Sequence, residues 1–203
     1  MDSISPLNTS PCFFTPAAGN RNRPHAPGTT SQPIVPPKPD GNEILVELLI
    51  FNGAPFKDHW AYWVCSRDDP LIGVKVHVTG DVRTGFEFQA KRSHSLYSST
   101  NLPSKRVPLQ WVSAHFFDEA MFNYGIDKDD DTPIGPFEVT ARLAEPPGKT
   151  LNIVDERNIS ERPVRRRIIQ RDCQTWVCES SDKLVEGGIF KDEVAAYLRA
   201  ITQ

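Results

Sequence analysis

The fold is decided by the stretch Ile72-Gly73-Val74-Lys75-Val76-His77-Val78-Thr79, in which apolar and polar residues alternate. Successive side chains of a β-strand point to opposite faces, so the valines share one face and the polar residues share the other. After a turn at 80–85 the alternation resumes over 86–91. The two stretches therefore predict an antiparallel hairpin with one buried face and one polar face.

Apolar runs extend this hairpin in both directions along the chain. Residues 44–51 and 59–65 read as two more strands, and together with the hairpin they predict an antiparallel meander over about 44–92. Residues 106–117 predict a further strand, which Pro108 breaks or displaces to an edge because proline cannot donate to a sheet. We also expect a strand at 137–143, a helical turn at 118–124 and a short helix at 149–157.

The C-terminal part is predicted to be helical. Asp172 is a favourable N-cap for a helix from 172 to about 186, and Gly187-Gly188 is a natural C-cap. A last helix at about 190–201 carries one apolar stripe. The sequence thus predicts an α+β domain over 43–203, in which the meander packs against a helix that carries Cys173 at its N-terminus. Residues 1–42, rich in Pro, Ser and Thr, are predicted to be a disordered tail.

Composition excludes several classes of function. The 203-residue chain has a net charge of -3 and a pI near 6.0, which argue against nucleic-acid binding. No run of about 18 apolar residues and no secretory signal is evident, so we expect no transmembrane segment. Four irregularly spaced cysteines fit neither a disulfide scaffold nor a zinc site, and a reducing, cytoplasmic setting is the expectation.

Cys173 is the candidate nucleophile, because a helix N-terminus favours a thiolate. A nucleophilic cysteine needs a base and a group that orients the base. His59 and His77 lie on adjacent predicted strands, where such positions approach to about 5 Å at Cβ. A helix N-terminus packed on the polar face of the His77 strand would complete the set. The alternatives are a buried, inert thiol and strand histidines that are satisfied by core hydrogen bonds.

Other candidates are weaker. Glu87 or Gln89 could replace His77 as the orienting group. The basic run 165–167, with Arg162 and Arg171, could hold an anionic substrate and lower the pKa of Cys173, although a solvated basic strand is the simpler interpretation. Four acidic residues have calcium-loop spacing, but position 6 is Thr132 and Pro133 follows it, so a solvated acidic loop is favoured. These four are Asp127, Asp129, Asp131 and Glu138. We expect no metal and no cofactor.

Three blocks carry a resemblance to known proteins: His59-Trp60-Ala61-Tyr62, Val76-His77-Val78 and Asp172-Cys173-Gln174-Thr175-Trp176-Val177. Their order resembles the circularly permuted papain-like superfamily, in particular the lecithin retinol acyltransferase-like group. The blocks are also similar to a fungal family of small proteins of unknown function that occurs beside secondary-metabolite genes.

The resemblance implies a function and three roles. Cys173 would be the nucleophile that forms an acyl-enzyme, His59 its base and His77 the orienting group. The protein would then be a cysteine-dependent hydrolase or acyltransferase of a small-molecule or acyl substrate, with an ester, amide or thioester bond. An accessory or tailoring role in fungal natural-product biosynthesis is also implied. The alternative is a catalytically inactive binding or scaffold protein of the same fold.

Overall fold

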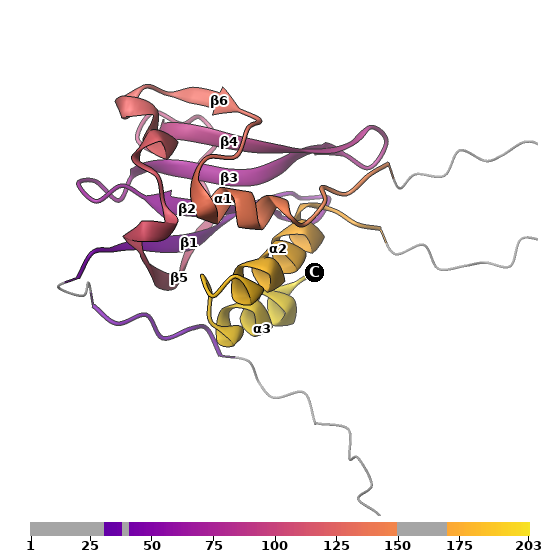
Figure 1. Ribbon diagram of the computed structural model, residues 1–203. Helices are drawn as coiled ribbons and strands as arrows, with labels where there is room; N and C mark the ends of the chain where they lie inside the picture. Colours follow the sequence, from indigo (N-terminus) through magenta and orange to yellow (C-terminus); the bar gives the residue numbers. More distant parts are fainter. Residues whose placement is uncertain (1–30, 38–40, 150–169) are drawn as a thin grey trace, which may run out of the picture.

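The described part of the chain forms a six-stranded antiparallel sheet with three α-helices, an α+β arrangement (Figure 1). The computed structural model describes residues 31–37, 41–149 and 170–203. The strand order is β5-β1-β2-β3-β4-β6. The strands are β1 (Glu43–Phe51), β2 (His59–Cys65), β3 (Ile72–Asp81), β4 (Gly85–Ser95), β5 (Lys105–Ser113) and β6 (Lys128–Asp130). The helices are α1 (Gly135–Arg142), α2 (Cys173–Glu186) and α3 (Asp192–Ile201), with the 3₁₀ helices η1 (Ala114–Phe116) and η2 (Glu119–Gly125).

The predicted meander is confirmed, because β1, β2, β3 and β4 are each hydrogen-bonded to the next in sequence. The side chains of β1 and β2 alternate between two apolar clusters on opposite sides of the sheet. The larger cluster includes Val74, Val76 and Val78 of β3 together with the buried apolar side chains of the helices. The smaller one, on the far face, includes Leu49, Ala61 and other apolar residues of β1 and β2. Burial on both faces explains why β1 and β2 read as nearly continuous apolar runs.

The hairpin between β3 and β4 is closed by a tight turn. The carboxylate of Asp81 accepts hydrogen bonds from the backbone N–H groups of Arg83 at 2.7 Å and Thr84 at 2.8 Å. Gly80 precedes the turn at φ 134°, where a Cβ atom would lie 2.2 Å from the carbonyl oxygen of Gly85. Only glycine fits that approach without a backbone shift.

Helix α2 begins where the sequence predicts. Asp172 accepts from the N–H groups of Gln174 and Thr175, both at 3.0 Å, and Thr175 Oγ1 accepts from the Asp172 N–H in return, a capping box. Tyr62 of β2 donates its hydroxyl to the Val177 carbonyl at 2.7 Å, which fastens the helix to the sheet. The predicted last helix is α3, and Gly188 at the end of α2 is left-handed.

The strand expected at 137–143 is wrong, because this segment is helix α1. Gly135 and Pro136 start the helix, and Phe137, Glu138 and Ala141 are buried, a helical rather than a two-residue spacing. Strand β5 ends at Ser113, short of the predicted 117, and it is an edge strand with a register shift near Pro108, as predicted. Strand β6 lies in the segment expected to be an acidic loop. The helix predicted at 149–157 falls outside the described residues beyond Lys149.

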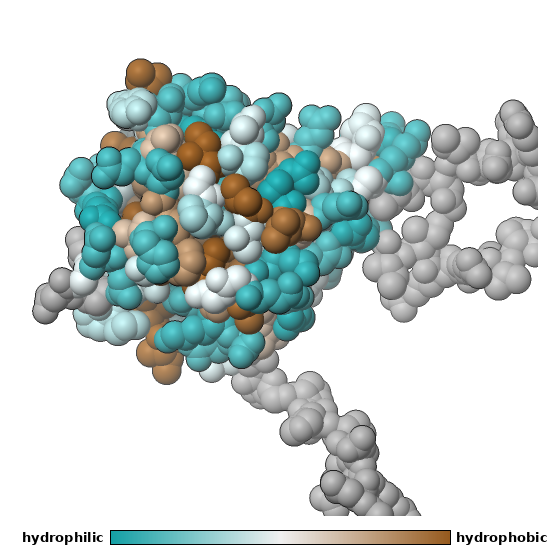
Figure 2. Space-filling model, in the orientation of Figure 1, coloured by the Kyte–Doolittle hydropathy of each residue, from teal (hydrophilic) through white to brown (hydrophobic). Residues whose placement is uncertain are grey.

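The face that carries the helices is largely polar, with scattered apolar side chains (Figure 2). Val139 and Leu143 of α1 are 49% and 64% exposed. None of the helices in the described part of the chain is long and apolar enough to cross a membrane. Of the predicted tail, residues 31–37 and 41–42 are described and form neither helix nor strand, and the indole of Trp111 donates a hydrogen bond to the Pro36 carbonyl at 3.0 Å. The prediction for 1–30 and 38–40 lies outside the described residues.

Candidate active site

Two histidines and a glutamine form a hydrogen-bonded chain across three strands. His59 Nε2 lies 3.0 Å from His77 Nδ1, and His77 Nε2 lies 3.0 Å from Gln89 Oε1. His59 opens β2, His77 is near the end of β3, and Gln89 is the direct cross-strand partner of His77 on β4. The proximity that the sequence predicts for the two histidines is confirmed. Gln89 does not replace His77 but continues the chain beyond it.

This hydrogen-bonded chain determines which ring nitrogen of each histidine carries a proton. An amide oxygen only accepts, so the N–H is on His77 Nε2, which donates a hydrogen bond to Gln89 Oε1. The other nitrogen of a neutral His77, Nδ1, then carries no proton and accepts a hydrogen bond from the N–H of His59 Nε2. A neutral His59 therefore holds its proton on Nε2 and keeps an unprotonated Nδ1. That atom has the lone pair that a general base needs.

Both imidazoles are held in the neutral form. Burial, and then the positive charge of Lys75, lowers the pKa of His59 from its ordinary 6.5 to about 4. The same two causes lower the pKa of His77 well below 6.5, and His77 is only 5% exposed. At neutral pH both histidines are therefore neutral, and the hydrogen-bonded chain has one arrangement of its protons.

Cys173 is buried at the first turn of α2, on the other side of the sheet from the histidine rings. The Sγ atom of Cys173 lies 3.9 Å from the carbonyl oxygen of Asp58, and the residue is 7% exposed. The expectation that the helix packs on the polar face of β3 is wrong, because α2 packs against the valine face. Burial explains the difference, since the apolar stripe of α2 needs an apolar partner. Among the described hydrogen bonds, the partner of the thiol is Asp58 rather than an imidazole.

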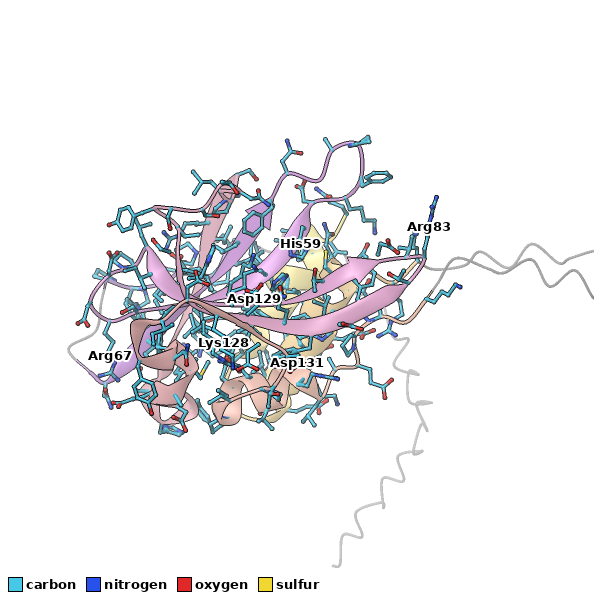
Figure 3. The ribbon with its side chains drawn as sticks, turned by 90° about the horizontal axis from the view of Figure 1, so that it is seen from above. His59, Arg67, Arg83, Lys128, Asp129 and Asp131 are labelled. Atoms are coloured by element: carbon cyan, nitrogen blue, oxygen red, sulfur yellow. The ribbon has the colours of Figure 1, made fainter. Side chains whose placement is uncertain are left out.

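His59 and Cys173 nevertheless line one cavity of about 830 Å³ at an end of the sheet. The strand that carries His59 starts there, and the N-terminus of α2 reaches the same end. The walls come from the loop before β2, the β3–β4 hairpin and the start of α2, and they include Phe56, Val82 and Phe86. Figure 3 shows His59 among the strands and Arg83 at the outer tip of the hairpin. His59 and Cys173 thus share a cavity at this end of the sheet, although no described hydrogen bond joins the thiol to an imidazole.

Three side chains that no sequence motif singles out join the segments at this end of the sheet. The amide of Gln174, a fully buried residue, donates to the Asp58 carbonyl at 2.8 Å and accepts from the Gln203 N–H at 2.9 Å. Gln203 Oε1 accepts from the Asp58 N–H at 2.9 Å, and Gln203 Nε2 donates to the Asp58 carboxylate at 3.0 Å. We call Asp58, Gln174 and Gln203 the latch. It joins the residue before His59 to the residue after Cys173.

A salt bridge adds to the latch, since Lys57 Nζ lies 3.1 Å from the Asp172 carboxylate.

The thiol of Cys173 is kept protonated. Burial raises the pKa of Cys173, against the lowering effect of the backbone N–H groups of Trp60, Gln174 and Cys173. The thiolate expected from the helix N-terminus is therefore not the resting form, because desolvation outweighs those groups.

The acidic segment does not form a calcium site. The carboxylate of Glu138, at position 12 of the spacing, is fully buried and bonded to both terminal nitrogens of Arg92, at 3.0 and 3.1 Å. Arg92 Nε also pairs with Asp130 at 3.0 Å. Within residues 31–37, 41–149 and 170–203, no three His, Cys, Asp or Glu side chains are grouped so as to hold a metal ion. The run 165–167 and Arg162 lie outside the described residues, and Arg171 pairs with Glu179.

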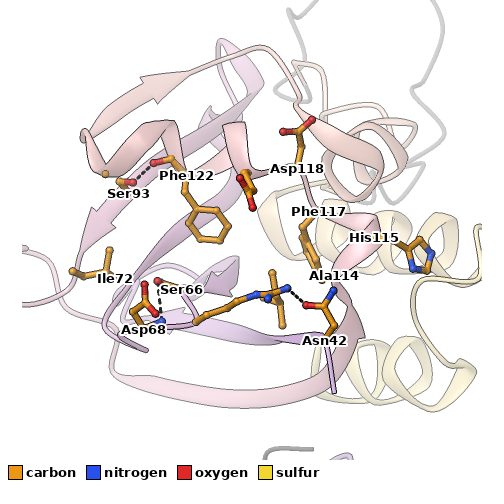
Figure 4. A pocket seen from close by; sticks show the side chains of 14 residues that line it. Asn42, Ser66, Asp68, Ile72, Ser93, Ala114, His115, Phe117, Asp118 and Phe122 are labelled. Atoms are coloured by element: carbon orange, nitrogen blue, oxygen red, sulfur yellow. Dashed lines mark hydrogen bonds between the residues drawn. The ribbon is translucent and has the colours of Figure 1, made fainter. Parts of the chain in front are cut away.

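A second cavity, of about 610 Å³, opens at the opposite end of the sheet (Figure 4). Its lining includes Arg67 and Asp68 after β2, Ser93 of β4, and Phe117 and Phe122 near the 3₁₀ helices. None of Cys173, His59 and His77 reaches it. The candidate chemistry is therefore confined to the cavity that contains the thiol.

Fold and site together define an α+β protein with a cavity at one end of its sheet, lined by Cys173 and by His59, the first residue of the histidine chain. Comparison with family models matches residues 46–191 to the family of unknown function DUF6540. The match covers most of the chain, and the protein belongs to this family. No curated protein and no solved structure matches the chain.

Proposed function

We propose that the protein is a cysteine-dependent hydrolase or acyltransferase with a relationship to the circularly permuted papain-like enzymes. One observation carries the proposal: His59 and Cys173 line the same cavity, while His77 and Gln89 leave Nδ1 of His59 free of a proton. His59 is then the base for Cys173, and His77 and Gln89 orient it.

In this mechanism the proton leaves the thiol only as the sulfur attacks. Cys173 Sγ bonds to the carbonyl carbon of an ester, amide or thioester, and the proton moves to Nδ1 of His59. His59 returns it to the leaving group as the acyl-enzyme forms, and water or a second nucleophile then releases the acyl group. Asp172 already accepts from the N–H groups of Gln174 and Thr175. The N–H of Cys173 is therefore the helix donor we assign to the oxyanion.

The proton transfer is uphill in the resting protein. Burial raises the pKa of Cys173, while burial and then the charge of Lys75 lower the pKa of His59 to about 4. The transfer is therefore completed only as the sulfur bonds to the carbonyl carbon, and the nucleophile that it needs is a free thiol, as in a reducing, cytoplasmic setting.

The test is to trap the acyl-enzyme. The protein is mixed with p-nitrophenyl acetate, and the acetyl group is located by peptide mass spectrometry. We expect acetyl-Cys173 in the wild type and in Cys178→Ser, a matched control five residues along α2. We expect no adduct in Cys173→Ser and at least about a hundredfold slower acylation in His59→Ala, the contribution of a general base. Acylation of Cys173 that is indifferent to His59→Ala would contradict the proposal.

A binding or scaffold role is the second candidate, and the resting protonation state favours it. Burial keeps the thiol of Cys173 neutral, and its described hydrogen bond is to Asp58. This role predicts that Cys173→Ala leaves the biological function intact. A role in natural-product biosynthesis stays a prediction, which metabolite profiling of a gene deletion beside a Cys173→Ala strain would test.

A further inference from the structure

Lys75 lies beside the histidine chain, and the mechanism above does not use it. It precedes His77 by two residues on β3, so both side chains point to the same face of the sheet. Its Nζ lies 5.3 Å from the centre of the Phe51 ring, and that ring lies 5.9 Å from the ring of His59. The Phe51 ring thus lies between the Lys75 ammonium and the His59 imidazole. Lys75 and His77 are separated by one intervening residue of β3.

No carboxylate in the described part of the chain lies within salt-bridge distance of Lys75. Its cross-strand partner is Lys91, whose charge is balanced by Asp129 at 3.0 Å. Burial and Lys91 together lower the pKa of Lys75 to about 8, while Asp129 opposes them. Lys75 is therefore mostly charged at pH 7. Other ionisable groups on this side are Glu87 and His94 of β4 and the Glu47–Arg106 pair.

An unpaired ammonium in this position repels a proton on either imidazole. After burial, Lys75 is the largest cause of the lowered pKa of both His59 and His77. The effect of burial and the effect of the Lys75 charge on the histidine pKa values can be separated by mutation. Burial of the rings is fixed by the fold, whereas the charge depends on one side chain and disappears when Lys75 is neutralised.

We propose that Lys75 is a positioning residue that acts on Cys173 through the histidine chain, and that its charge restrains how readily His59 accepts the proton of the thiol. Neutralising Lys75 makes His59 a stronger base and Cys173 a faster nucleophile at neutral pH. This inference rests on the proposed function for its effect on Cys173, but its effect on the imidazoles stands by itself.

The experiment compares Lys75→Gln, which removes the charge, with Lys75→Arg, which keeps it. Imidazole signals of His59 and His77 are titrated by NMR, and Cys173 alkylation by iodoacetamide is timed at pH 7. We expect Lys75→Gln to raise the His59 midpoint by about one pH unit, the usual effect of removing a nearby like charge. Alkylation should accelerate by about three- to tenfold, since a stronger base takes the proton more readily. Lys75→Arg should match the wild type.

Lys91→Gln is the matched control on the neighbouring strand, and its effect should be less than half as large because Asp129 already balances Lys91. A His59 midpoint that is unchanged in Lys75→Gln overturns the inference. Titration of Lys75 itself in the wild-type protein is a second measurement, with a midpoint near 8 expected and an ordinary value near 10.5 contradicting it. A raised midpoint without faster alkylation would instead count against His59 as the base, and thus against the proposed function.

Discussion

Replacement of Gln174 by alanine should damage both stability and the coupling between His59 and Cys173. The substitution removes three hydrogen bonds of the Gln174 amide, to the Asp58 carbonyl and to the backbone and side chain of Gln203. Each is worth about 0.5 to 1.5 kcal/mol net, and solvent can reach Gln203, so we expect a loss of about 2 kcal/mol in the free energy of unfolding. Urea unfolding measures that loss.

The second readout is the ratio of Cys173 alkylation rates in the presence and absence of His59, measured with and without Gln174→Ala. We expect the ratio to fall toward one, because the latch holds the start of β2 against α2. Gln110→Ala is the matched control: its amide bonds the Ile189 carbonyl at 3.1 Å and the Lys191 N–H at 2.9 Å, away from the cavity. An equal fall of the ratio in Gln110→Ala, or a stability loss below about 0.5 kcal/mol in Gln174→Ala, would refute this reasoning.

Three further predictions concern stability. Glu138→Gln should cost about 3 kcal/mol in urea unfolding, because it leaves the buried charge of Arg92 with less compensation; a loss no larger than that of an exposed pair would contradict this. Asp172→Ala should lower the melting temperature, because removal of the capping box costs about 1 to 2 kcal/mol in the free energy of unfolding. Asp172→Asn should retain most of the wild-type stability. Acid should destabilise the fold between pH 6.5 and 4: His59 is neutral when folded, so unfolding takes up a proton there, worth up to about 3 kcal/mol, and His59→Gln should flatten that slope.

The sheet was predictable because its signals are local. Alternation in β3 placed His77 on a polar face, and the short connection to β2 placed His59 beside it, as the 3.0 Å contact confirms. Glycine and aspartate at the hairpin, and Asp172 before α2, act through their immediate neighbours. In α1 the local signals misled, because Phe137, Val139 and Thr140 favour strands whereas burial of Phe137 and Ala141 demands a helix.

The position of the thiol depends on packing between distant segments. The valine face of β3 is the apolar one, so the apolar stripe of α2 packs there and not on the polar face that carries His77. Cys173 consequently shares with His59 only the cavity at the end of the sheet. The latch had no sequence signal, because glutamine amides 29 residues apart and an aspartate 145 residues from Gln203 form no motif. The raised pKa of Cys173 likewise follows from burial, which the helix-start pattern alone does not reveal.

The latch also sets an order of assembly. The meander forms from neighbouring strands, so β1 to β4 can pair while the chain is still being synthesised. The hydrogen bonds between Gln203 and Asp58 span 145 residues, so they form only after α3 and Gln203 have left the ribosome. A nascent chain therefore carries a folded sheet and a complete histidine chain before its cavity is closed. Until Gln203 binds Asp58, Cys173 is more open to reaction with other thiols or electrophiles than it is in the folded protein.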